Sequence, residues 1–369
     1  MLIRKLELRN YRNYEELELP LEDSVNIFLG PNAQGKTNIV EAVFYASLGH
    51  SHRTHADHEL IRWEQRDARI ELQLERLGVV QKLGFELSAE RRRRILINGH
   101  PVPHKELIGK LNTVLFSPED LFLIKGSPQN RRRFLDSELS QASPSYYQEL
   151  LSYTKIVTQR NALLKNIREH RAKREMLGIW DRQLAESAAR IVSKRLEAVK
   201  KLNMLANLMQ RRISANAENL FIGYELHHGE NSMTNDLTSW YNEKIGELQE
   251  LDILRGSTGI GPHRDDLRLS VNGADLRTFG SQGQQRTGAL ALKLSELEFL
   301  HSETGEYPVL LLDDVMSELD AVRRKQMLEF IRKEHIQTLI TATDAAYFPE
   351  QSMGAVYHVH AGTVKRKWG

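Results

Sequence analysis

One octapeptide restricts the fold of this chain more than any other feature of the sequence. It matches the pattern G-x-x-x-x-G-K-[ST] at every fixed position and consists of Gly30, Pro31, Asn32, Ala33, Gln34, Gly35, Lys36 and Thr37. The apolar run 25–29 before it predicts a buried strand, and residues 37–48 after it predict a helix that ends at Gly49. Strand, loop and helix in this order predict a nucleoside triphosphate site, because the backbone N–H groups of such a loop surround phosphates at the helix N-terminus.

Two side chains of this loop are expected to act on the nucleotide directly. Lys36 would reach the β- and γ-phosphates, and the Thr37 hydroxyl would bind Mg²⁺. A chance glycine-rich turn is the alternative, and the strand and helix on either side argue against it. The loop that follows the helix contains four histidines between positions 50 and 58. Their spacing fits no zinc motif, and in this loop Arg53 is a candidate for contact with phosphate or a partner subunit.

A second aliphatic run, residues 309–312, predicts a buried strand that ends in Asp313 and Asp314. Ligands of open α/β sheets bind at the carboxyl ends of the strands. We therefore expect Asp313 to bind Mg²⁺ together with Thr37, directly or through water. Asp314 is the candidate for polarising the attacking water, since it is the next carboxylate along the chain. An acidic surface turn is the alternative, and four consecutive aliphatic residues argue against it.

The pattern of apolar residues divides the chain into three parts. Residues 1–128 mostly alternate as strands do, and Asn98-Gly99 is a hairpin signal. Residues 129–252 lose this alternation and predict long helices, whereas residues 253–369 alternate strands with helices. We therefore expect an α/β nucleotide-binding head formed by 1–128 and 253–369, with a mainly helical arm inserted at 129–252.

Within the arm, Pro144 and Gly178 are the expected breaks between helices, and Gly223 is expected to mark a loop. In the last part, Asn272-Gly273 repeats the hairpin signal.

Composition excludes several classes of protein. The chain has 369 residues, of which 40% are hydrophobic and 27% charged, and no apolar run reaches the ~18 residues of a membrane span. We expect no membrane partner. The sequence contains no cysteine, which excludes disulfides and cysteine-based zinc sites and favours a cytoplasmic location.

The charge distribution is uneven although the net charge is only +2. Residues 155–212 carry fifteen Lys and Arg against five acids, whereas residues 213–252 carry one Lys against eight acids. Such a basic stretch is typical of a nucleic acid interface and equally of a solvated helix face.

Two arginine runs add to this picture. For the run 91–94, contact with DNA phosphates is favoured over protection of a sheet edge. For the run 131–133 we expect a mixed role, in which part of the run forms ion pairs with Asp136 and Glu138. Because no base-reading motif is visible, DNA binding is expected to be independent of sequence and strongly salt-dependent.

Two further motifs resemble those of ABC-type ATPases. Ser281, Gln282 and Gly283 precede a helix expected from about Thr287, as in the signature motif, and residues 317–320 resemble the D-loop. In that class the signature of one subunit contacts the γ-phosphate on the P-loop of another. The resemblance implies an ATP-dependent homodimer in which the three signature residues bind the nucleotide of the second copy.

The resemblance narrows to the RecF family, whose members are related to the heads of SMC proteins. It is carried by residues 118–120, 124–136, 261–267 and 311–324, and it extends from Asn10-Tyr11-Arg12-Asn13-Tyr14 to the last strand. It implies an ABC/SMC-type ATPase head with a mixed sheet and an inserted helical arm, and it places Arg12 near the nucleotide.

For function, the resemblance implies a cytoplasmic protein that binds ATP and DNA, including duplexes and single-to-double-strand junctions, with weak DNA-stimulated ATPase activity. It also implies action with RecR, and indirectly with RecO and RecA, to load RecA at gapped DNA in repair, replication restart and the SOS response.

Two departures from the ABC pattern qualify this expectation. Ser117-Pro118-Glu119 stands where a Q-loop glutamine belongs, and residues 341–344 contain no switch histidine. Slow turnover and an ATP-dependent clamp therefore fit better than a motor. An SMC-like head that tethers DNA is the alternative, although an arm of about 120 residues without a heptad array argues against it. A small-molecule kinase is a third reading, in which the signature and D-loop would have no use.

Overall fold

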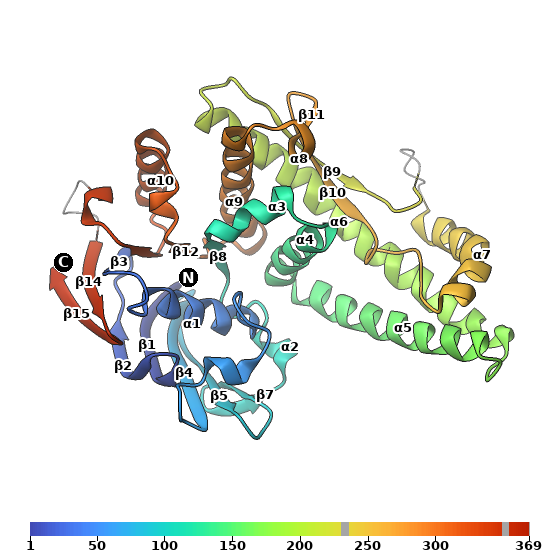
Figure 1. Ribbon diagram of the computed structural model, residues 1–369, viewed down its shortest axis with the longest axis horizontal. Helices are drawn as coiled ribbons and strands as arrows, with labels where there is room; N and C mark the ends of the chain where they lie inside the picture. Colours follow the sequence, from blue (N-terminus) through green and yellow to red (C-terminus); the bar gives the residue numbers. More distant parts are fainter. Residues whose placement is uncertain (230–235, 349–353, 369) are drawn as a thin grey trace. The chain divides into compact units, whose positions relative to one another are not determined.

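The computed structural model describes residues 1–229, 236–348 and 354–368, and it divides the chain into two compact units (Figure 1). The first contains Met1–Asp120 and Glu296–Gly369, and the second contains Leu121–Ser295. The second unit extends beyond the range 129–252 expected for the arm, from Leu121 at one end to Ser295 at the other. The three-part division drawn from the sequence stays a prediction.

An antiparallel sheet forms one layer of the first unit, with strand order β2-β1-β4-β5-β6-β7. Its strands are β1 (Leu2–Tyr11), β2 (Tyr14–Pro20), β4 (Asp67–Arg76), β5 (Val79–Ser88), β6 (Arg94–Ile97) and β7 (His100–Val102). One face is buried and the other is charged, as the alternation in the sequence predicts. Asn98 and Gly99 have φ angles of 51° and 81° in the turn between β6 and β7, which confirms the predicted hairpin.

A mixed sheet forms the second layer, with strand order β15-β14-β3-β13-β12-β8. Its strands are β3 (Val25–Leu29), β8 (Thr113–Phe116), β12 (Val309–Asp313), β13 (Thr338–Ala342), β14 (Gly354–His360) and β15 (Thr363–Trp368). All pairs are parallel except β14 with β15. The predicted strands at 25–29 and 309–312 are confirmed, and they lie on either side of β13.

Helix α1 (Lys36–Leu48) joins the two layers. Its apolar residues share one core with the buried faces of both sheets, for example Val43 with Phe85 of β5 and Leu311 of β12. The helix begins one residue before the predicted position and ends at Gly49, whose φ of 70° suits glycine. Helix α10 (Ala321–Lys333) is capped by Asp320, whose carboxylate accepts the N–H of Arg323.

Short helices complete the first unit and its connection to the second: η1 (Asp57–Leu60), α2 (His104–Leu107), η2 (Pro118–Leu121), η4 (Val315–Ser317) and η5 (Ala345–Tyr347). Helix α9 (Gln282–Thr304) contains the boundary between the two units and begins five residues before the predicted start.

Four long helices dominate the second unit: α4 (Pro128–Ala142), α5 (Pro144–Arg168), α6 (Leu177–Ile213) and α7 (Leu237–Arg255). Shorter helices are α3 (Phe122–Lys125), η3 (Arg174–Met176) and α8 (Leu276–Phe279). Within this unit α5 and α6 run side by side (Figure 1). The break at Pro144 is confirmed, whereas Gly178 lies inside the first turn of α6. In the described part of the chain, no helix has the length and apolar character needed to cross a membrane.

A three-stranded sheet, β11-β10-β9, also belongs to the second unit. Its strands are β9 (Leu220–Glu225), β10 (Asp266–Val271) and β11 (Ala274–Asp275). The prediction of a loop at Gly223 is wrong, because this residue lies in β9 and pairs with Arg268 of β10. At the other edge of β9, Asn203 and Asn207 of α6 accept the backbone N–H groups of Ile222 and Leu220. Helix side chains thus replace a neighbouring strand.

Two buried arginines connect the elements of the second unit. Arg160 of α5 donates to Asp181 of α6 and Asp252 of α7, both at 2.7 Å. Arg195 of α6 donates to Asp136 of α4 at 2.7 Å and to the carbonyl of Pro262 at 2.6 Å. A buried guanidinium must be paired to be tolerated, so these contacts allow few other arrangements of the helices.

The loop before β10 contains two buried groups with opposite pKa shifts. Burial raises the pKa of Asp265 to about 6, although it accepts hydrogen bonds from the Tyr224 hydroxyl and the His227 N–H. Burial lowers the pKa of His263 to about 4, and its Nδ1 lies 2.5 Å from the Tyr153 hydroxyl. Unfolded values are about 3.9 for Asp and 6.5 for His.

These shifts predict opposing effects of pH on the stability of the second unit. Asp265 stabilises the fold below about pH 4, and this contribution is lost as pH rises through about 6. The contribution of His263 is present above about pH 6.5 and is lost as pH falls through about 4. In Asp265→Asn, the free energy of unfolding should therefore rise more steeply with pH between pH 4 and 6 than in wild type. In His263→Gln it should rise less steeply than in wild type over the same range.

Urea unfolding at several pH values tests these two slopes. The fluorescence of Trp180 and Trp240 monitors unfolding of the second unit, in a background in which Trp63→Phe and Trp368→Phe remove the other two tryptophans. Wild-type pH slopes in both variants would contradict the assignment.

Candidate functional site

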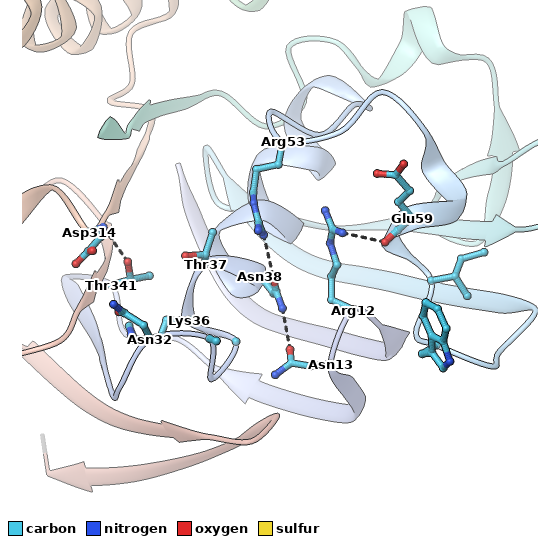
Figure 2. Close-up of a pocket in the computed structure, with 14 residues that line it drawn as sticks. Arg12, Asn13, Asn32, Lys36, Thr37, Asn38, Arg53, Glu59, Asp314 and Thr341 are labelled. Atoms are coloured by element: carbon cyan, nitrogen blue, oxygen red, sulfur yellow. Dashed lines mark hydrogen bonds between the residues drawn. The ribbon is translucent and has the colours of Figure 1, made fainter. Parts of the chain in front are cut away.

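The phosphate-binding loop and the carboxyl end of β12 line one cavity of about 580 Å³ in the first unit (Figure 2). The lining residues come from the β1–β2 turn, the loop and helix α1, the segment that follows α1, and the ends of β12 and β13. They are Arg12, Asn13, Asn32, Ala33, Gly35, Lys36, Thr37, Asn38, Arg53, Glu59, Ile61, Trp63, Asp314 and Thr341.

The loop adopts a conformation that depends on its glycines. Gly35 has a φ of 114°, and a Cβ atom there would lie 2.6 Å from the Asn13 side-chain nitrogen. A Cβ on Gly30 would lie 2.3 Å from the carbonyl oxygen of Val359 in β14. A side chain is excluded by the lack of space at Gly30, and by both the φ angle and the lack of space at Gly35.

Contacts from two other turns fix the loop. Asn13, between β1 and β2, donates to the Gln34 carbonyl at 2.8 Å. The N–H of Ala361, between β14 and β15, donates to the Gln34 side chain at 2.8 Å. These hydrogen bonds hold the loop at Gln34 without the help of a ligand.

Lys36 and Thr37 begin helix α1 at the centre of this cavity. The Lys36 ammonium donates to the carbonyls of Gly30 and Pro31 at 2.6 and 2.7 Å. Burial lowers the pKa of Lys36, against the attraction of Asp314 and Asp313. The Thr37 hydroxyl donates to Asp313 Oδ1 at 2.8 Å. Thr37 of the loop and Asp313 of β12 thus lie in contact, as the sequence predicts.

Thr341 of β13 organises the two aspartates. Its hydroxyl donates to Asp313 Oδ1 at 2.7 Å and accepts the backbone N–H of Asp314 at 2.9 Å. Asp314 has a φ of 56°, a strained angle for a residue other than glycine. Its Oδ1 is buried, with no hydrogen-bond partner among the described residues. Burial raises the pKa of Asp314, opposed by Lys36 and supported by the charge of Asp313.

A buried carboxylate, Glu41 of α1, holds two arginines on another wall of the cavity. Arg12 binds it with two hydrogen bonds of 2.6 and 2.9 Å, and the Ser51 hydroxyl donates to it at 2.6 Å. Burial alone would raise the pKa of Glu41, but the hydrogen bonds from Arg12 and Ser51 outweigh it and the pKa is lowered. Arg53 lies 3.4 Å from Glu41. It also donates to Asn38 at 3.0 Å, as Figure 2 shows.

The residues present fit a nucleoside triphosphate with Mg²⁺. The backbone of residues 30–37 and Lys36 provide positive potential for phosphates, while Thr37 and Asp313 supply two oxygen ligands of the kind Mg²⁺ prefers. Asp314 lines the same cavity, and its buried Oδ1 has no hydrogen-bond partner among the described residues. Arg12 lines this cavity as expected, although its guanidinium is held by Glu41.

The three signature residues belong to the second unit, at the start of α9. Ser281 forms a reciprocal cap: its hydroxyl accepts the N–H of Gln284, whose side chain accepts the N–H of Ser281. Gln282 is the first residue of the helix, and a Cβ on Gly283 would find only the Ser281 hydroxyl, at 3.9 Å. This helix terminus is open to a ligand or partner on its outer side.

Sequence reasoning missed Asn13, Asn38, Glu41, Thr341 and Trp63 as parts of the site. Asn13, Asn38 and Thr341 act through contacts with residues distant in sequence, so no local pattern identifies them. Glu41 carries one signal, because it is a charged residue within the apolar run 39–43 of α1.

The two arginine runs have divided roles. In the run 91–94, Arg93 donates to Tyr45 and Asp57, whereas Arg91 and Arg92 are exposed. With Arg9, Arg69 and Arg94 they line a cavity of about 450 Å³ that also contains Asp67 and Glu86.

In the run 131–133, Arg131 is buried and pairs with Asp266, and Arg132 donates to the Asp265 carbonyl. The sequence offered Asp136 and Glu138 as ion-pair partners of this run, but Arg131 pairs with Asp266 and Asp136 pairs with Arg195.

Comparisons with known proteins agree with this geometry. The family model described as RecF/RecN/SMC N terminal domain matches residues 2–365. "DNA replication and repair protein RecF" of Halothermothrix orenii is 45% identical over 93% of this chain and 92% of its own. The protein of the same name from Bacillus cereus strain G9842 is 43% identical over 99% of this chain and 98% of its own.

Solved structures give the same result. "Structure of the recombination mediator protein RecF-ATP in RecFOR pathway" matches with a TM-score of 0.91 and 35% identity, over 99% of this chain and 97% of that one. An SMC head bound to the C-winged helix domain of ScpA matches with a TM-score of 0.58 and 14% identity, which shows the fold alone. The fold is therefore that of an ABC/SMC-type ATPase head, and the chain belongs to the RecF family of DNA replication and repair proteins.

Proposed function

We propose that this chain is an ATP-dependent DNA-binding protein that hydrolyses ATP slowly and forms a homodimer when ATP is bound. The observation that carries the proposal is the meeting of Lys36, Thr37 and Asp314 around one cavity, with Asp313 hydrogen-bonded to Thr37. The ATP named for the 35% identical RecF structure is consistent with this ligand.

The residues of the site divide the work of hydrolysis. The loop 30–37 binds the phosphates, with the Lys36 ammonium exchanging its two carbonyl partners for phosphate oxygens. Thr37 and Asp313 hold Mg²⁺, which neutralises phosphate charge when it is bound. Asp314 accepts a proton from the attacking water, and its raised pKa makes it a stronger acceptor than an ordinary aspartate. Thr341 keeps both carboxylates in place.

The second copy supplies the other half of the composite site. Ser281, Gln282 and Gly283 begin a helix whose N-terminal N–H groups attract anions, and they contact the γ-phosphate on the loop of the partner. ATP thereby closes the dimer, and its hydrolysis releases it.

In the cell, the protein acts in the cytoplasm with RecR, and indirectly with RecO, to load RecA at gapped DNA. The name RecFOR pathway, given with the similar RecF structure, supports these partners. DNA repair, replication restart and the SOS response are the processes served. An SMC-like DNA tether has less support, since the SMC heads are only 14% identical to this chain and show the fold alone.

The signature residue gives the first test of the dimer. Ser281→Arg places a bulky cation at the cap of α9 and should leave ATP binding intact while the protein stays monomeric. Light scattering after size exclusion, with and without ATP and Mg²⁺, measures the mass. Ser302→Arg is the matched control, because Ser302 is an exposed serine of the same helix. An ATP-dependent dimer of Ser281→Arg would contradict the composite site.

The assignment of Asp314 predicts a separate loss. Asp314→Asn should bind ATP and dimerise but lose at least about 100-fold in the hydrolysis rate, since a general base contributes about 10²–10⁴. Phosphate release in single-turnover conditions measures the rate. Asp23→Asn, an exposed aspartate paired with Arg4, serves as the control. Wild-type hydrolysis by Asp314→Asn would exclude its role as base.

DNA binding is expected to involve the exposed Arg91 and Arg92. The double variant Arg91→Gln, Arg92→Gln should weaken duplex binding equally for unrelated sequences, and the slope of log K against log salt should fall by about two, one for each lost phosphate contact. Fluorescence anisotropy with labelled DNA measures both. Arg366→Gln, which removes an exposed arginine paired with Glu22, is the control. Unchanged affinity and slope would contradict a role of Arg91 and Arg92, and would favour the basic helices of the second unit as the DNA-binding surface.

A further inference from the structure

The exposure of Trp63 in the first unit is not explained by packing. Its side chain is 87% exposed, the largest value among the exposed large hydrophobic residues. Tryptophan normally buries most of its ring, because the ring carries a large apolar surface. Trp63 also lines the phosphate-binding cavity, and Figure 2 shows Glu59 of the same segment across this cavity from Lys36 of the loop.

Hydrogen bonds connect Trp63 to the phosphate end through a short series of neighbours. Asn13 contacts the loop at Gln34, and the adjacent Arg12 donates its backbone N–H to Leu60 and its side chain to the Glu59 carbonyl. Ile61 forms a β-bridge with Tyr11. The segment 59–63 therefore continues the wall of the cavity away from the phosphates, and an aliphatic and an aromatic side chain lie at its end.

The turn that carries Trp63 is fixed. The N–H of Gln65 donates to the Arg62 carbonyl at 3.0 Å, and Glu64 between them has a φ of 64°. Arg62 donates its N–H to the Asn10 carbonyl and its side chain to Glu15. A strained residue other than glycine in a well-anchored turn is typical of functional positions. The turn thus holds the indole at the cavity rather than leaving it to collapse onto the sheet.

We propose that Trp63, with Ile61, forms the platform on which the base of the bound nucleotide stacks. This inference rests on the proposed ATP function and names the part of the ligand that the phosphate loop does not reach. A cavity with cationic and backbone donors at one end and an exposed indole at the other matches a nucleotide, which has phosphates at one end and an aromatic base at the other.

The same geometry predicts which bases are accepted. Next to Trp63 in the described cavity wall, the Arg12 guanidinium is engaged by Glu41 and the Glu59 carbonyl, and the Glu59 carboxylate accepts the Thr54 hydroxyl. These polar side chains are occupied, so recognition relies on stacking rather than on reading the edge of the base. Stacking is stronger for the larger purine rings, and it is nearly the same for adenine and guanine. Purine triphosphates should therefore bind more tightly than pyrimidine triphosphates, with little difference between ATP and GTP.

The test compares ligands with and without a base. Isothermal titration in Mg²⁺ would measure the binding of ATP, GTP, CTP and inorganic tripolyphosphate to the full chain carrying Ser281→Arg, which keeps one copy per site. Trp63→Ala should weaken ATP and GTP about tenfold, equal to about 1.4 kcal/mol, and should leave tripolyphosphate unchanged. Trp63→Phe should restore most of the loss. Phe122→Ala, an exposed aromatic of the second unit, is the control.

Each alternative has its own outcome. An equal loss for ATP and tripolyphosphate would mean that Trp63 supports the loop, and no loss for ATP would mean that it serves a protein partner; either result overturns the proposal. Strong preference for ATP over GTP would overturn the stacking-only reading. If neither ATP nor tripolyphosphate binds the protein with Trp63 intact, the proposed ATP function itself fails. Quenching of fluorescence by ATP, lost in Trp63→Phe, gives an independent signal.

Discussion

The hydrogen bonds to Asp313 Oδ1 are the contacts on which the site depends. This one oxygen accepts the hydroxyl of Thr37, at the start of α1, and the hydroxyl of Thr341, at the end of β13. Three elements that are far apart in sequence meet there, and Thr341 also fixes the backbone of Asp314. Loss of this geometry would separate the phosphate loop from the carboxylates, even if each motif kept its local structure.

One carboxylate balances the charge of two arginines on the wall of the cavity. Glu41 is fully buried, and it compensates two arginines that would otherwise repel each other on the wall. Arg12 is held by two short bonds and Arg53 by longer ones, so the two guanidiniums differ in how readily they exchange partners. A buried charge is tolerated only when it is paired. Removal of Glu41 would therefore leave Arg12 and Arg53 without their shared partner on this wall of the cavity.

Sequence patterns identified the central motifs because their residues are consecutive. The strand, loop and helix around Lys36 and the strand before Asp313 have local signals, and the structure has them where they were expected. Thr341 has no such signal, since its role arises from the order of β3, β13 and β12 in the sheet. Strand β9 was missed for a similar reason. Its partners are β10, more than 40 positions later, and asparagines of α6 that complete its edge. In the run 91–94 the sequence is uniform, and only the neighbours Tyr45 and Asp57 distinguish Arg93 from Arg91.

The close contact of Gly30 with β14 has a consequence for synthesis of the chain. The phosphate loop occupies positions 30–37, yet Gly30 packs against the carbonyl of Val359 and the Gln34 side chain accepts the N–H of Ala361. Strand β3 also has its two neighbours, β13 and β14, near the end of the sequence. A ribosome that has made only the first three hundred residues therefore carries the complete motif without the site. Asp313 and both neighbours of β3 are made only after that point, so the site forms late in the synthesis of the chain.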